Sequence, residues 1–143
     1  MPDLWPSEFN FSHIITPVAV LREQASLISQ KTQQIINGRT STSKYQSQNS
    51  KGANFFIHTL YFVVPLLDDY EYRVLNVRHK LELFPVTITS HIHDSEIDCP
   101  NLEEYQNELK KIFGSEEMIQ VVSSLMAQVK DIHSNTSEEV IAN

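Results

Sequence analysis

Residues 55–67 read FFIHTLYFVVPLL, and this stretch decides the fold. Aromatic and β-branched side chains dominate it, which is typical of a β-strand. Both alternating sets of side chains are largely apolar, with His58 and Thr59 as the polar exceptions. Because a strand that is apolar on both sides must be covered on both sides, we expect this one to lie at the centre of the protein.

Two more strands follow in the sequence. The acidic pair at residues 68–69 predicts a short turn, and residues 70–83 (YEYRVLNVRHKLEL) predict a second strand. Its apolar positions change side between Val74 and Leu75, which predicts a β-bulge there. Residues 86–92 predict a third strand. We therefore expect a three-stranded antiparallel meander.

Helices are expected before and after these strands. Apolar residues recur every three or four positions over residues 17–36, between a capping Thr16 and a stop at residues 37–38. Capping patterns predict two further helices, over residues 101–113 and from residue 115 to about 133. The order α-β-β-β-α-α predicts an α+β fold. The first helix also fits a heptad seam, so a helix-mediated dimer is an alternative to docking on its own sheet.

The chain length of 143 residues indicates a single domain over residues 1–143. Within it, residues 1–15 are expected to be an extended lead-in and residues 134–143 a frayed tail. Residues 39–54 (RTSTSKYQSQNSKGAN) are almost wholly polar. They predict a flexible loop, or alternatively a polar hairpin arm that extends the following strand.

Composition excludes several classes of function. The net charge of −7 argues against a general nucleic-acid or anionic-membrane binder. Three widely spaced glycines cannot form a phosphate-binding loop. One cysteine, Cys99, can form neither an internal disulfide nor a CxxC motif. The sequence has no secretory signal and no apolar run long enough to cross a membrane, so we expect a cytoplasmic protein.

His91 and His93 form the best candidate for a metal site. Residues two apart in a strand point to the same side, so both imidazoles would share a face near Asp94. Such a pair suits zinc or another divalent ion, in a metal-binding protein or a metal-dependent hydrolase. The sequence supplies only two convincing ligands, and an exposed polar strand end explains the same pattern.

No Ser-His-Asp or Cys-His arrangement is evident, so we favour a non-enzymatic role while leaving catalysis open. The strand that is apolar on both sides predicts a homodimer, or a protein-interaction module with an unknown protein partner. A second alternative is weak nucleic-acid binding through residues 39–51, with Arg39, Lys44 and Lys51 on phosphates. The runs 61–70 and 84–88 resemble small bacterial proteins, and this resemblance implies no activity.

Overall fold

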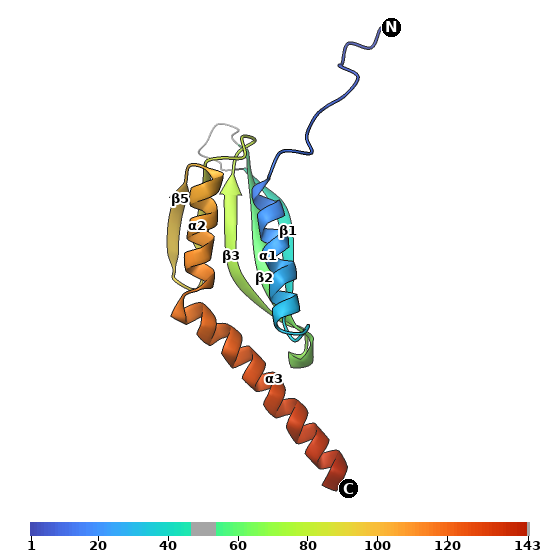
Figure 1. The fold of residues 1–143 in the computed structure, drawn as a ribbon, viewed down its shortest axis with the longest axis vertical. Helices are drawn as coiled ribbons and strands as arrows, with labels where there is room; N and C mark the ends of the chain where they lie inside the picture. Colours follow the sequence, from blue (N-terminus) through green and yellow to red (C-terminus); the bar gives the residue numbers. More distant parts are fainter. Residues whose placement is uncertain (47–53, 143) are drawn as a thin grey trace.

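The computed structural model describes residues 1–46 and 54–142, with side chains described up to residue 133. Five strands form one antiparallel sheet in sequence order, and three α-helices accompany it (Figure 1). The elements are α1 (Pro17–Lys31), β1 (Asn37–Gln46), β2 (Asn54–Val64), β3 (Tyr70–His79), β4 (Val86–Ser90), β5 (Ser95–Cys99), α2 (Leu102–Phe113) and α3 (Glu116–Ala142), with a 3₁₀ turn at Pro65–Leu67. The α+β class is therefore confirmed.

The sheet has five strands where the sequence predicted three. Residues 37–46 form β1, which pairs with β2 from Asn37 opposite Val63 to Gln46 opposite Asn54. Residues 39–46 are thus a hairpin strand, which confirms the alternative of a polar hairpin arm for these residues, and the flexible loop is wrong there because β2 supplies their hydrogen-bond partners. The rest of the predicted loop, residues 47–53, lies outside the described residues.

The fifth strand, β5, was missed, and the third was predicted too long. β4 ends at Ser90, residues 91–94 turn, and β5 returns from Ser95 to Cys99 beside β4. The predicted bulge in the second strand is confirmed. Leu60 pairs with Leu75 and Tyr61 with Arg73, so Val74 is the extra residue.

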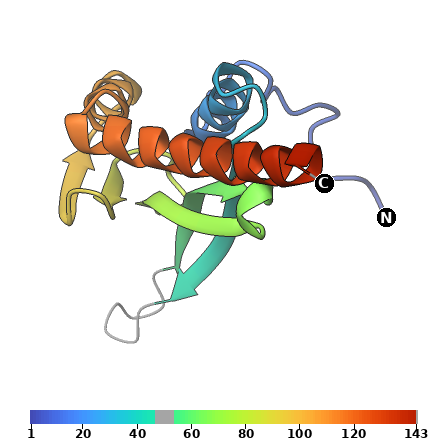
Figure 2. The same ribbon diagram turned by 90° about the horizontal axis from the view of Figure 1, so that it is seen from below.

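The helices lie on one side of the sheet (Figure 2). α1 begins as predicted, because Thr16 Oγ1 accepts a hydrogen bond from the Ala19 N–H and Pro17 occupies the first turn. It ends at Lys31, five residues before the predicted end. Gln33 and Gln34 take the left-handed conformation, with φ of 53° and 67°, which stops the helix and turns the chain into β1.

α2 and α3 also start at predicted caps. The Asn101 side chain accepts from the Glu104 N–H, and the Ser115 hydroxyl accepts from the Met118 N–H. α3 then continues to Ala142, so residues 134–142 are helical where a frayed tail was predicted. Among the described residues, no helix combines the length and apolar character needed to cross a membrane.

The core lies between the helices and the sheet. Tyr105 on α2 is fully buried, and its hydroxyl donates a hydrogen bond to the Pro17 carbonyl at 2.9 Å. This bond connects α2 to the N-terminus of α1. α1 and β1 touch directly at Gly38, which lies against the Ala25 backbone. The close approach needs a residue without a side chain at position 38.

Candidate functional site

His91 and His93 lie in the turn between β4 and β5 and not on a strand. His91 is exposed, and its Nε2 lies 3.5 Å from Asn76 Nδ2 on β3. Burial and the nearby Arg73 lower the pKa of His91, against an opposing effect of Asp94. The two-residue periodicity that placed both imidazoles on one face therefore does not apply, because the strand ends before them.

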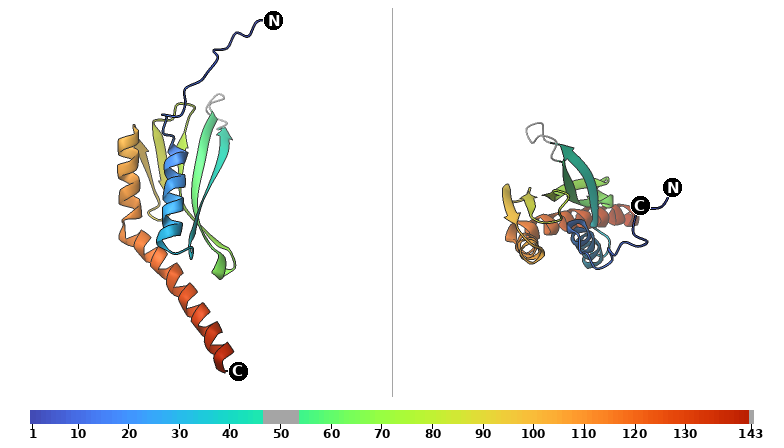
Figure 3. Two further views of the ribbon diagram at one scale, coloured as in Figure 1. Left: turned by 45° about the vertical axis from the view of Figure 1, so that its right-hand side comes forward. Right: turned by 90° about the horizontal axis from the view of Figure 1, so that it is seen from above.

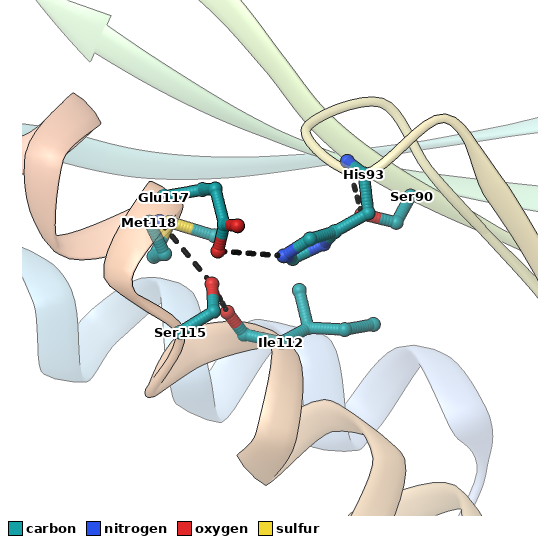
Figure 4. A network of polar contacts seen from close by, with 6 residues as sticks. All are labelled: Ser90, His93, Ile112, Ser115, Glu117 and Met118. Carbon is teal, nitrogen blue, oxygen red and sulfur yellow. Dashed lines mark hydrogen bonds and ion pairs between the residues drawn. The ribbon is translucent and has the colours of Figure 1, made fainter.

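His93 connects this turn to the first turn of α3 (Figure 4). Its Nδ1 lies 3.0 Å from Ser90 Oγ, and its Nε2 lies 3.4 Å from Glu117 Oε2. Glu117 lies at the N-terminus of α3, where a backbone hydrogen bond lowers its pKa and His93 adds to the effect. His93 thus links the end of β4, through Nδ1, to the first turn of α3, through Nε2.

Zinc binding at His91 and His93 stays a prediction. The structure gives the two imidazoles different partners, Asn76 and Glu117. Within residues 1–46 and 54–133, no three His, Cys, Asp or Glu side chains lie close enough together to hold a metal ion. A metal at this turn would need His91 and further ligands to move toward His93.

His58 on β2 and His79 on β3 form a buried pair of histidines. Their Nε2 atoms lie 2.9 Å apart. His79 Nδ1 lies 2.6 Å from the Lys80 carbonyl, and His58 Nδ1 lies 2.8 Å from Thr42 Oγ1. Only the β2–β3 register brings residues 21 positions apart together, so no local signal could have found the pair.

The partners of the pair determine where its protons lie. The Lys80 carbonyl can only accept, so His79 Nδ1 carries a proton and, in the neutral ring, His79 Nε2 accepts from His58 Nε2–H. His58 Nδ1 then accepts from the Thr42 hydroxyl. Burial, His79 and Arg22 lower the pKa of His58 to about 4. With both rings neutral, the arrangement is a chain of hydrogen bonds that joins β1, β2 and β3.

The sheet face opposite the helices carries an apolar strip from β2 that charged side chains cover. Gly38 faces α1, so its neighbour Arg39 points to the opposite face. Arg39 pairs with Glu71 and lies over the Tyr61 ring, with its guanidinium carbon 4.5 Å from the ring centre. These contacts partly cover the second side of β2 within one subunit.

The basic residues of the predicted nucleic-acid loop do not share a face. Arg39 and Lys44 are an odd number of positions apart on β1, so they project to opposite sides of the sheet. Lys51 lies outside the described residues. Binding of nucleic acid through this segment stays a prediction.

Residues 1–15 form an arm that extends away from the body (Figures 1 and 3). Trp5 and Phe11 are 75% and 74% exposed, and no apolar element of the described chain covers them. The only ring contact of Trp5 is with Phe9, 6.3 Å away within the arm itself. The large apolar residues exposed on the arm are Met1, Leu4, Trp5, Phe9, Phe11, Ile14 and Ile15.

A groove runs between α1 and the neighbouring α2 and α3, and we call it the α1–α2 groove. One part has a volume of about 230 Å³, with Leu60 and Phe62 of β2 as its floor. Its walls are Leu27 and Ile28 from α1, Phe113 from α2, and Met118 and Val122 from α3. A second part, of about 470 Å³, continues between α1 and α2 and shares Gln24 and Phe113 with the first.

Comparisons of this chain with models of protein families, with curated proteins and with solved structures found no match.

Proposed function

We propose that this chain is a cytoplasmic, non-enzymatic protein-interaction module that acts as a homodimer, with the arm of residues 1–15 as its main contact element. The observation that carries the proposal is the apolar character of the arm together with its exposure. Clusters of exposed aromatic side chains on soluble proteins mark interaction surfaces. Tryptophan and other aromatic residues are also enriched among the residues that dominate binding energy.

The size of the arm fits this role. Each aromatic side chain can bury roughly 150–250 Å² on binding, and the arm exposes three of them. Leu4, Ile14 and Ile15 add further apolar area. Two such arms in a symmetric dimer reach the range of about 1,200–2,000 Å² that stable interfaces bury.

The conformation of the first half of the arm is already restricted before binding. Pro2 and Pro6 fix their own φ angles and disfavour helical conformations for the residues before them. The Asp3 side chain accepts a hydrogen bond from the Trp5 N–H at 3.1 Å. Fewer conformations are lost on binding, which lowers the entropic cost of association.

Light scattering coupled to size-exclusion chromatography tests the proposal. We expect the wild-type chain at micromolar concentration to have twice the 16.5 kDa mass of one chain. The triple variant Trp5→Ser/Phe9→Ser/Phe11→Ser should be monomeric. The matched control is Leu81→Ser, because Leu81 is 80% exposed between β3 and β4 but lies outside the arm. A monomeric wild type, or a triple variant that still dimerises, would contradict the proposal.

A further inference from the structure

The α1–α2 groove matches the arm in chemistry. Its floor and walls are apolar, and Leu27, Ile28 and Phe113 are only partly buried there. An extended segment with large apolar side chains would complete the burial of these residues. The opposite face of the sheet is a poorer receptor, since an arm lying there would compete with the ion pairs of Arg39 and Arg78.

Charge also favours the groove as the receptor. Asp3 and Glu8 are the acidic residues of the arm. Lys31 borders the first part of the groove, and Lys110 borders the second, beside Glu23. In the described part of the chain, neither lysine has an ion-pair partner. One lysine is therefore available near each part of the groove for an acidic group of the arm.

The direction of the arm favours a second copy over the same chain. Thr16 is extended, with ψ of 155°, and the hydrogen bond between Tyr105 and the Pro17 carbonyl fixes the point where the arm begins. From there the arm leads away from the helices (Figure 1). The residues of α1 that line the groove run the other way, from Val20 to Lys31. The chain already turns at residues 12–13, where the Ile14 N–H donates to the Phe11 carbonyl. Docking in the same chain would need a second reversal beside that turn, whereas docking on a neighbour keeps the observed direction of the arm.

We propose that the arm of each copy occupies the α1–α2 groove of a second copy, so that two chains exchange arms around a two-fold axis. The inference rests on the proposed function, because it assigns the receptor for the arm that the proposal makes the contact element. Each chain supplies one arm and one groove, so a dimer satisfies both and leaves no arm to recruit a third chain.

Variants of the groove test this assignment in the full-length chain. Leu27→Glu places a carboxylate on the partly buried wall and should weaken dimerisation at least a hundredfold. The matched control is Ile119→Glu, which makes the same chemical change on α3 at a residue that is 56% exposed and does not line the groove. It should dimerise like wild type. Lys31→Glu, at an exposed rim position, should weaken the dimer several-fold without risk to the core.

Mixing separates exchange between copies from docking within one chain. The arm variant Trp5→Ser/Phe9→Ser/Phe11→Ser keeps an intact groove, and Leu27→Glu keeps an intact arm. Neither should dimerise alone, but an equimolar mixture should form a heterodimer held by one arm in one groove. Carrying different affinity tags, the two variants should therefore co-purify.

The outcomes distinguish this inference from the proposed function. If wild type is a monomer, the proposed function fails. A second outcome is that wild type is a dimer, the arm variant is a monomer, and folded Leu27→Glu and Lys31→Glu both remain dimers. In that case the arm binds elsewhere and only the groove assignment is wrong. If each variant is monomeric and the mixture remains monomeric, exchange between copies is wrong.

Discussion

Gly38 allows α1 to approach the sheet, and Gly38→Ala should therefore destabilise the protein strongly. A Cβ at this position would lie 2.5 Å from Ala25 Cα and 2.7 Å from the Ala25 carbonyl carbon. Carbon atoms that are not bonded pack at about 3.5–4.0 Å, so α1 would have to move by about 1 Å. The clash is with the backbone of Ala25, and no side-chain rotation can relieve it.

The magnitude follows from the contacts that such a shift disturbs. Overpacking a core contact costs about 1–3 kcal/mol. The Gly38 N–H also donates to Ser29 Oγ at 2.9 Å, and losing this hydrogen bond adds about 1 kcal/mol. Replacing a glycine lowers the entropy of the unfolded chain, which returns about 0.4–1 kcal/mol. We expect a net loss of about 2–3 kcal/mol in the free energy of unfolding.

Urea unfolding followed by far-UV circular dichroism measures this loss. Fluorescence of Trp5 would be a poor probe, because that residue lies on the exposed arm. With a typical slope of about 1–3 kcal/mol per molar urea, the midpoint should fall by about 1–2 M. Gly114→Ala is the matched control, since its Cβ would meet only the Lys110 carbonyl oxygen at 3.2 Å. An unchanged midpoint for Gly38→Ala would refute the close contact between α1 and β1.

Two further predictions concern buried titratable groups. The pKa of His58 is about 4 in the folded chain and about 6.5 in the unfolded chain, so the unfolded state binds more protons between these values and stability falls as the pH drops through that window. The free energy of unfolding, measured by urea titration, should fall by an amount on the order of 2 kcal/mol between pH 7 and pH 5. His58→Gln should largely remove this loss, whereas the control His13→Gln, on the exposed arm, should retain it. Equal pH dependence in all three proteins would be evidence against a neutral His58. Cys99 is fully buried, and burial, with Glu108 as the next cause, raises its pKa to about 11. Its thiol should react with a thiol reagent at pH 8 at least a hundredfold more slowly in the native than in the urea-unfolded chain, and rapid labelling of the native protein would contradict this.

Local sequence determined the starts of the helices and the central strands. Thr16 caps α1 and Asn101 caps α2 as predicted, because a cap acts on backbone groups only two or three residues away. β2 is rich in aromatic and β-branched residues, so its strand conformation could be predicted without knowledge of its neighbours.

Only the tertiary structure decided the pairing of the two edge strands, the partners of the histidines and the position of the groove. β1 and β5 are largely polar, and they become strands because β2 and β4 present unpaired backbone groups to them. The His58–His79 pair depends on the register between β2 and β3, and the turn at His91 and His93 depends on where β5 folds back. The groove exists only because α1 and α2 lie over the same sheet face with β2 beneath them. These features depend on partners distant in the chain, which a local pattern of residues does not encode.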